Sequence, residues 1–349
     1  MKTKIVRIEE ENIDRQAIRE AGEILKAGGL VAFPTETVYG LGGDALNGAS
    51  SGKIYRAKGR PSDNPLIIHI AGMDYLPRIV KTIPEAAYKL AGLYWPGPLT
   101  MIFEKADCVP LETTGGLGTV AVRMPSNAIA RALIEAAGGY VAAPSANLSG
   151  RPSPTLARHV IEDMDGRIDM IIDGGEADIG LESTIVDLTG NGAVLLRPGF
   201  ITREMLEEAV KEVTVDRTIL EGGAAGAPKA PGMKYRHYAP RGNLVIVEGE
   251  QDKVIGGINS RLKDHRQAGE KTGVIATDET AALYQADSVK SLGMRSDEMA
   301  IAKHLFRILR EFDEEEVQFM YAESFEATGM GQAIMNRLLK AAGHQVVQL

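Results

Sequence analysis

Hydrophobic and polar residues follow two different rhythms along this chain and divide it into three segments. From residue 13 to about 212, short apolar runs typical of strands alternate with stretches that have the period of amphipathic helices. Residues 216–242 interrupt this pattern with a run rich in Gly, Ala and Pro, which cannot build a hydrophobic core. The pattern therefore predicts a larger domain over 1–215, a linker over 216–242 and a smaller domain over 243–349.

The larger domain is predicted to be a twisted, open, mixed sheet flanked by helices. Its last strands follow one another with little helix between them, which favours a mixed sheet over a regular parallel one. Strands are expected at 30–33, 66–70, 99–103, 119–123, 140–143, 170–172, 183–187 and 193–196. Helices are expected at 13–27, 127–137, 155–163 and 202–212, with Thr155 and Thr202 as N-caps of the last two.

The smaller domain shows a regular alternation that predicts a Rossmann-like parallel α/β arrangement. Strands at 244–248, 273–276, 287–292, 317–321 and 345–348 are separated by helices at 251–268, 279–285, 297–312 and 330–342. No Gly-x-Gly-x-x-Gly follows its first strand, so we assign it no dinucleotide. Residues 40–45 match that fingerprint formally, but six residues separate them from their strand, and we reject the match.

Composition narrows the class of protein without naming it. The chain has 349 residues, 44% of them hydrophobic and 25% charged, which is typical of a globular protein with ordinary cores. It contains no apolar run long enough for a membrane span, and its first residues show no secretory signal. The single cysteine, Cys108, fits a reducing cytoplasm, and the net charge of −8 speaks against extended nucleic-acid binding.

Polar and charged residues gather in four segments that each follow a strand-like run: 34–42, 58–65, 143–150 and 196–199. Loops at strand ends are where side chains converge on a ligand. Two of these loops carry Lys or Arg and a third is rich in Ser and Asn, a combination that suits a polyanion such as a nucleotide phosphate.

Lys58 and Arg60 follow a helical stretch, and the plain alternative is a basic helix C-terminus favoured by the macrodipole. That alternative leaves the stiff sequence from Arg60 to Pro65 unexplained. Two prolines restrict this loop and would hold Arg60 and Asn64 in place at low entropic cost, as a binding loop requires.

Ser145 and Asn147 follow the strand at 140–143 and are ordinary turn residues when taken alone. Together with Ser149 and Ser153 they offer several short hydroxyls that can cradle a phosphate. Arg123 ends another strand, where a buried guanidinium needs a carboxylate. A substrate carboxylate and an internal Asp or Glu are both open as its partner.

The remaining titratable residues give weaker signals. His69 lies inside an apolar strand, where a lone histidine is usually a core residue, and the six histidines show no metal-ligand spacing. Four acids in loops are expected to be solvated, with a metal-bridging or water-ordering role as the alternative: Glu36, Asp173, Glu176 and Glu182. The linker carries a net charge of +3 between segments of −6 and −5, and we interpret it as a lid over an anionic ligand, a solvated spacer being the alternative.

The four polar segments, in this order, resemble those of the YrdC/Sua5 family of threonylcarbamoyl-AMP synthases. The likeness covers residues from about 12 to 212, and the linker sequence from Pro231 to Pro240 and the small α/β domain extend it to the C-terminus. A chain with this second domain resembles the long, two-domain Sua5 type. The family's Lys-x-Arg and Ser-x-Asn signature, which implies the catalytic residues, falls on Lys58, Arg60, Ser145 and Asn147.

The resemblance implies a reaction in which L-threonine, bicarbonate and ATP, with Mg²⁺, give threonylcarbamoyl-AMP and pyrophosphate. A transferase complex of other proteins would then pass the group to tRNA to form threonylcarbamoyladenosine (t6A). A weak contact between this chain and tRNA is left open, and no membrane partner is expected. The likeness assigns threonine binding to Thr37, His69, Arg123, Ala143 and Ser183. It assigns ATP binding to Arg60, Asn64, Thr119, Ser145, Ser153, Arg197 and Tyr235.

Two other functions fit a chain of this kind. An RNA-binding protein of the same fold is disfavoured by the net charge of −8 and by the absence of aromatic stacking motifs. A carbamoyl-adenylate-forming enzyme of the hydrogenase-maturation type would carry additional acyl-phosphatase and zinc-finger regions, and this chain shows neither. Pyrophosphate release that depends on threonine would separate the three.

Overall fold

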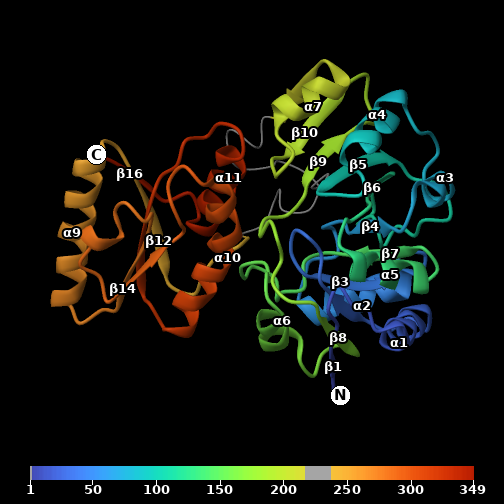
Figure 1. Ribbon diagram of the computed structural model, residues 1–349, viewed down its shortest axis with the longest axis horizontal. Coiled ribbons are helices and arrows are strands. Elements are labelled where there is room, and N and C mark those ends of the chain that lie inside the picture. The colour runs from blue at the N-terminus through green and yellow to red at the C-terminus, as the bar shows by residue number, and fades with distance from the viewer. Residues whose placement is uncertain (1, 217–236) are drawn as a thin grey trace. The chain divides into compact units, whose positions relative to one another are not determined.

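The computed structural model describes residues 2–216 and 237–349, which form two compact units. The first comprises Met1–Ser149, Ser153–Asp178 and the described part of Glu182–Tyr235. The second comprises Gly150–Pro152, Ile179–Leu181 and the described part of Arg236–Leu349. Each unit is a sheet with helices packed on it, and the predicted fold class is confirmed (Figure 1).

The first unit is built on an eleven-stranded mixed sheet of order β1-β8-β2-β3-β7-β4-β6-β5-β9-β10-β11. Every strand expected from the sequence is present. The bounds are β1 (Lys4–Arg7), β2 (Val31–Phe33), β3 (Gly40–Asp44), β4 (Ile67–Ile70), β5 (Leu99–Glu104), β6 (Thr119–Arg123), β7 (Tyr140–Ala143), β8 (Met170–Asp173), β9 (Thr184–Asp187), β10 (Ala193–Arg197) and β11 (Val213–Val215).

The four helices expected in the first unit are present, with one wrong cap, whereas the helices between residues 73 and 94 were not predicted. The helices of this unit are α1 (Arg15–Lys26), α2 (Gly48–Lys58), η1 (Met73–Tyr75), α3 (Leu76–Ile79), α4 (Glu85–Tyr94), α5 (Ala128–Ala136), α6 (Ala157–Met164) and α7 (Arg203–Val210). Thr202 caps α7 by accepting from the Met205 N–H at 3.3 Å, as expected. Thr155 does not cap α6, which begins two residues later. Its carbonyl oxygen instead accepts from the Ala177 N–H at 2.9 Å.

Strand β3 was not predicted, because its sequence Gly-Leu-Gly-Gly-Asp has low strand propensity. Its glycines are there for close packing, since a Cβ on Gly42 would lie 2.8 Å from Val141 Cγ1 and 3.0 Å from Phe33 Cε1. The same residues matched the dinucleotide fingerprint. A strand that pairs antiparallel with β2 and β7 cannot serve as a phosphate-binding turn, so rejecting the match was right.

The two faces of this sheet differ in what covers them. One face carries the main core, in which strand residues pack against α2, α3, α4, α6 and α7. On the opposite face, α1 and α5 pack over β2, β7 and β8. Farther along that face lies a small apolar cluster that, among the described residues, consists of strand residues only: Ile67, Ile102, Ala121, Ile185 and Leu196.

The second unit is a five-stranded sheet of order β14-β13-β15-β12-β16, and all its paired strands are parallel. Its elements are β12 (Asn243–Glu248), α9 (Gln251–Gln267), β13 (Thr272–Ala276), η2 (Ala281–Leu283), β14 (Ser288–Ser291), α10 (Glu298–Glu314), β15 (Phe319–Glu323), α11 (Gly331–Ala341) and β16 (Val346–Gln348). Helix α9 covers one face of this sheet, and α10 and α11 cover the other (Figure 1).

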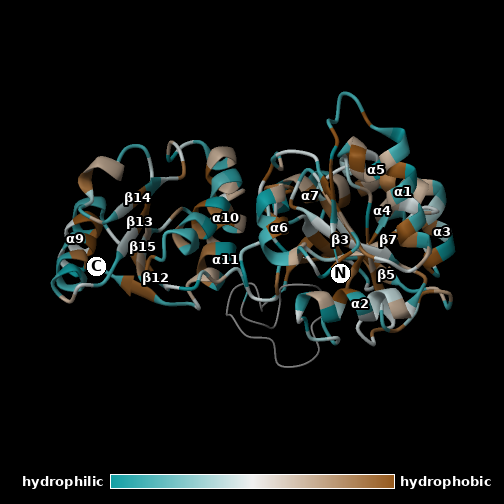
Figure 2. Ribbon diagram, turned by 90° about the horizontal axis from the view of Figure 1, so that it is seen from below, coloured by the Kyte–Doolittle hydropathy of each residue, from teal (hydrophilic) through white to brown (hydrophobic). Residues whose placement is uncertain are grey.

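The hydropathy of the strands and helices agrees with their places in these layers. In Figure 2, β12 is coloured as hydrophobic, while α9 mixes hydrophilic and hydrophobic residues as an amphipathic helix does. Between residues 2 and 216 and from residue 237 onward, no helix combines the length and apolar character that a membrane span requires.

Candidate active site

Strand register places the predicted site residues that lie on strands on one face of the first sheet. In a sheet, residues opposite each other on neighbouring strands point to the same side. His69 on β4 and Thr100 on β5 are both paired with Arg123 on β6. Thr100 is paired with Ile185 on β9, and Ile185 with Arg197 on β10. The shared face is the one that carries the small apolar cluster.

Arg123 is buried, and its guanidinium is held by an internal acid. Its Nη2 lies 2.7 Å from Glu36 Oε1, and the two side chains are only 5% and 6% exposed. Its Nη1 donates to Thr37 Oγ1 at 2.8 Å. Of the two partners left open by the sequence, the internal carboxylate is therefore present. A buried guanidinium without it would be strongly destabilising.

Ser183 connects a second buried arginine to this group. Arg197 donates from Nε to the Ser183 carbonyl at 3.0 Å and from Nη2 to its hydroxyl at 3.1 Å. The same hydroxyl lies 2.7 Å from Thr100 Oγ1. Because Thr100 is the register partner of Arg123, Ser183 and Arg197 lie near Arg123 on the same face of the sheet.

Two of the loop acids are buried, so the expectation that they are solvated was wrong for them. Glu36 is 5% exposed and Glu182 is 7% exposed. Glu182, which directly precedes Ser183 in the chain, accepts a hydrogen bond at Oε1 from Ser153 Oγ at 2.5 Å. Sequence reasoning missed Glu36 as the partner of Arg123. Its position in the polar segment 34–42 was the available signal.

Lys58 joins the end of α2 to the Ser/Asn loop. The side chain is 2% exposed. Its Nζ donates to the Ser145 carbonyl at 2.5 Å, to the Asn147 carbonyl, and to Asn147 Oδ1 at 3.3 Å. In return the Ser149 N–H donates to the Lys58 carbonyl at 2.9 Å. Lys58, Ser145 and Asn147, distant in sequence, are therefore in direct contact.

The loop after α2 begins with a left-handed residue, which sets the direction of Arg60. Gly59 has φ of +62°, and the Arg60 N–H closes the helix end on the Tyr55 carbonyl at 2.9 Å. The Arg60 side chain donates to the carbonyls of Asn64 at 3.3 Å and Pro65 at 3.1 Å. The loop is therefore tied to its own arginine, as its two prolines suggested.

Thr119 and Arg123 lie at opposite ends of β6, about 13 Å apart at the rise of an extended strand. Ile67 is paired with Ala121, so Thr119 lies beside the Pro65 end of β4 and near the Arg60 loop. Ala143 is paired with Ile67, and after Ala143 the chain continues to Ser145 at the Pro65 end of β4. Site residues thus form two groups at opposite ends of these strands, one around Arg60 and one around Arg123. Tyr235 lies outside the described residues, as does most of the proposed lid.

His69 lies in the Arg123 group as a neutral side chain. Burial, together with the positive charge of nearby Arg123, lowers the pKa of His69 from 6.5 to about 3. Its Nδ1 lies 3.1 Å from the Ile67 carbonyl oxygen, and its ring meets Phe33 edge to face. His69 therefore offers hydrogen bonding without charge at neutral pH.

Family models match both parts of the chain. The model described as "Telomere recombination" matches residues 23–199, and the model described as "Threonylcarbamoyl-AMP synthase, C-terminal domain" matches residues 201–343. The threonylcarbamoyl-AMP synthase of Pyrococcus abyssi is 48% identical over 97% of this chain and 98% of its own length. That of Bacillus subtilis is 48% identical over 95% of this chain and 94% of its own length.

A solved structure with a bound ligand is similar along the whole chain. The crystal structure of P. abyssi Sua5 complexed with L-threonine has a TM-score of 0.94 and 48% identity, covering 99% of this chain and 100% of that one. The mixed sheet with its polar face, followed by a small parallel α/β domain, defines a two-domain enzyme with a YrdC-like catalytic part. More specifically, the chain belongs to the threonylcarbamoyl-AMP synthase family.

Burial of neutral His69 predicts a component of acid sensitivity in the first unit. Below pH 6.5 the unfolded chain binds a proton at His69, whereas the folded chain does not until about pH 3. The free energy of unfolding should therefore fall by about 2 kcal/mol from this residue between pH 7 and pH 5. Urea unfolding of the wild type and of His69→Gln at both pH values measures this, and the variant should lose less stability.

His344→Gln, which changes an exposed histidine of the second unit, is the matched control and should keep the wild-type pH dependence. An identical loss of stability in the wild type and His69→Gln would contradict the neutral, buried state.

Proposed function

We propose that this protein forms threonylcarbamoyl-AMP and pyrophosphate from L-threonine, bicarbonate and ATP. The observation that supports this most directly is the L-threonine-bound P. abyssi structure, whose 48% identity and TM-score of 0.94 extend over 99% of this chain. A second support is the polar face of the sheet, where Arg123 and Thr37, both expected to bind threonine, are in contact. The product activates the carbamoyl group for transfer to tRNA.

Threonine is proposed to bind at the Arg123 group, through Thr37, His69, Arg123, Ser183 and the backbone of Ala143. The pair of Arg123 and Glu36 supports this assignment, because a free amino acid carries one positive and one negative group. Guanidinium and carboxylate 2.7 Å apart offer both complementary charges on a buried surface. Neutral His69 beside them adds hydrogen bonding without repelling the ammonium group of threonine.

ATP is proposed to bind across both groups, through Arg60, Asn64, Thr119, Ser145, Ser153 and Arg197, with Tyr235 as a further contact. Asn64 supports this because its side chain is 2% exposed and its Oδ1 has no hydrogen-bond partner among the described residues. A buried amide oxygen in that state destabilises the fold unless a donor reaches it. The amino group of adenine is a suitable donor.

Lys58 is proposed to act by positioning. Its ammonium group is already surrounded by oxygen atoms of Ser145 and Asn147. It therefore fixes the loop whose hydroxyl and backbone groups would face the nucleotide. We assign Lys58, Arg60, Ser145 and Asn147 together as the group that orders the phosphates for reaction.

The proposed chemistry needs no protein nucleophile. The threonine amine forms a C–N bond to the carbon of bicarbonate, a C–O bond of bicarbonate breaks, and water leaves to give a carbamate. A carbamate oxygen then forms a bond to the α-phosphorus of ATP. The bond between the α-phosphorus and the bridging oxygen breaks, and pyrophosphate leaves with that oxygen and its electron pair. Catalysis then consists of positioning both substrates and stabilising charge on the phosphates, which buried arginines supply.

Mg²⁺ is proposed to enter with the phosphates of ATP, and not as a resident ion. Within the described parts of the chain, no group of three or more His, Cys, Asp or Glu side chains is arranged to hold a metal. Transfer of the product to tRNA by partner proteins and a cytoplasmic location remain predictions from the sequence.

Pyrophosphate release tests the proposed function directly. We expect purified protein to release pyrophosphate from ATP only when both L-threonine and bicarbonate are present, because the attacking carbamate requires both. Omitting each in turn is the measurement. Equal release without threonine would contradict the assignment, and tRNA binding without any release would favour an RNA-binding role.

Arg60→Met should lower the rate of pyrophosphate release by about a hundredfold, the typical effect of removing one charge-stabilising donor. The melting temperature should change little, because the lost hydrogen bonds lie within one loop. Arg56→Met, which removes an exposed arginine one turn earlier on α2, is the control and should keep wild-type activity. A parallel loss of activity and stability in Arg60→Met would refute a direct role.

Arg123→Lys should raise KM for threonine by about tenfold or more and affect KM for ATP far less. Lysine keeps the positive charge beside Glu36 but lacks the planar fork that also reaches Thr37. Steady-state kinetics with each substrate varied separately provides the measurement. Equal increases in both constants would show that Arg123 supports the whole site and not the threonine site. Arg131→Lys, at an exposed position of α5, is the control.

A further inference from the structure

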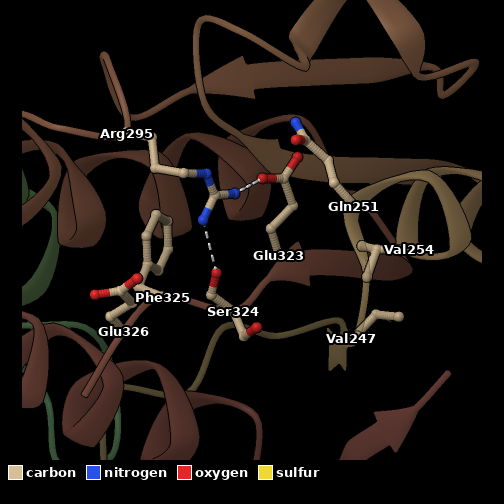
Figure 3. A pocket seen from close by; sticks show the side chains of 9 residues that line it. Val247, Gln251, Val254, Arg295, Glu323, Ser324, Phe325 and Glu326 are labelled. Atoms are coloured by element: carbon tan, nitrogen blue, oxygen red, sulfur yellow. Dashed lines mark hydrogen bonds and ion pairs between the residues drawn. The ribbon is translucent and has the colours of Figure 1, made fainter.

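The second unit contains a cavity that the proposed reaction does not use. Its volume is about 310 Å³, within the range of small-molecule sites. It opens at the carboxyl ends of β12 and β15 (Figure 3). Its lining residues are Val247, Gly249, Gln251, Val254, Arg295, Glu323, Ser324, Phe325 and Glu326. None of them belongs to the site described above.

The topology of the sheet explains why a cavity lies here. Strands β12 and β15 are adjacent and parallel, but the chain leaves them in opposite directions. After β12 it continues into α9 on one face, and after β15 into α11 on the other (Figure 1). Such a switch point leaves a crevice at the carboxyl ends of the strands, where open α/β sheets bind ligands.

A guanidinium group is fixed on one wall of this cavity. Arg295 donates to a carboxylate oxygen of Glu323 and, from Nη1, to the Ser324 carbonyl at 3.0 Å. Its guanidinium carbon lies 5.3 Å from the centre of the Phe325 ring (Figure 3). These contacts hold the charged end of a long side chain that is 40% exposed. A surface arginine is ordinarily mobile, so this one is pre-ordered for a ligand.

Glu323 acts as the anchor and not as a free acid. Its carboxylate is 3% exposed, and besides Arg295 it accepts from the hydroxyls of Thr280 and, at 2.7 Å, Tyr284. Burial, with the Glu323 charge beside it, raises the pKa of Tyr284, so the tyrosine remains a donor. Both carboxylate oxygens are therefore occupied, and Glu323 is satisfied by the protein itself.

The N-terminus of α9 opens on the same cavity. This helix has 17 residues and begins at Gln251, and no side chain caps its first N–H groups. Such an end carries about half a positive charge. The opposing wall is apolar, with Val247 and Val254 both at most 5% exposed. One acid, Glu326, lies at the exposed rim.

We propose that this cavity binds a small organic carboxylate, with its charged group between Arg295 and the N-terminus of α9 and its apolar body on Val247 and Val254. Polyphosphates fit this site less well than a monocarboxylate, because repulsion by the two acids near the single guanidinium, Glu323 and Glu326, grows with the charge of the ligand. Both a simple carboxylic acid and a free amino acid carry the required group. An amino acid would additionally place its ammonium group near Glu326.

The test uses the full chain and three matched pairs of probes that differ only by an α-amino group. They are L-valine with 3-methylbutanoate, L-leucine with 4-methylpentanoate, and L-phenylalanine with 3-phenylpropanoate. Binding is measured by isothermal titration calorimetry, with inorganic phosphate as a further probe. We expect at least one carboxylate to bind and phosphate to bind more weakly than it does.

Arg295→Met should weaken that binding by about tenfold or more, as loss of a charge-assisted hydrogen bond does. Gln251→Trp, at an exposed position on the rim, should block the cavity while leaving the buried Glu323 network intact. It therefore keeps the test valid should Arg295→Met fail to fold. Arg261→Met, whose arginine bonds within α9 to the Gly257 carbonyl, is the control and should bind normally.

Glu326→Gln distinguishes the two sources of the ligand. If Glu326→Gln selectively weakens binding of the amino acid in a pair, the ligand is a free amino acid. If binding of both members is unchanged, the ligand is a simple carboxylic acid, and either result supports the proposed site. Absence of binding by all six carboxylates would overturn the proposal, as would binding that survives both Arg295→Met and Gln251→Trp, or a preference for phosphate. Pyrophosphate release is a separate measurement, so failure here leaves the proposed reaction untouched.

Discussion

The two-residue period of the first sheet is the constraint on which its site depends. Thr100, Arg123, His69 and Arg197 come from four strands, and their side chains share one face only because the strands are in register. A slip of one residue in any strand would turn its polar residue into the main core. The buried residues on the opposite face pack against five helices, so such a slip would also expose apolar side chains. Core packing therefore specifies the site as well as the fold.

Buried positive charges of the site are stable because each has a protein partner before any substrate arrives. Arg123 pairs with Glu36, and Arg197 and Lys58 are surrounded by hydroxyl and carbonyl oxygens. An unpaired charge at such a depth would be strongly destabilising. The partners also fix direction, because a guanidinium or ammonium held at several points has little freedom left. The free protein therefore already has the ordered side chains that catalysis by positioning requires.

Sequence reasoning predicted the strands well and the partners poorly. Apolar runs such as 66–70 and 119–123 identify buried strands, and a glycine between Lys58 and Arg60 ends a helix. Strand β3 was not predicted, because its glycines allow close contact with Phe33 and Val141, and no local sequence pattern reveals such a contact. The pairing of Glu36 with Arg123 was missed for the same reason, since it joins a loop to a strand end 87 positions later. The family resemblance supplied roles for residues whose contacts only the fold explains.

The two units place their sites differently because their helices cover the sheets differently. In the second unit helices lie on both faces of a parallel sheet, and the cavity lies at the carboxyl ends of two of its strands. In the first unit the main helices cover one face, and part of the other face carries polar side chains around a small apolar cluster. A broad face suits two substrates that must meet, whereas a narrow crevice suits one small ligand. Sheet coverage thus determines how many molecules each unit can bring together.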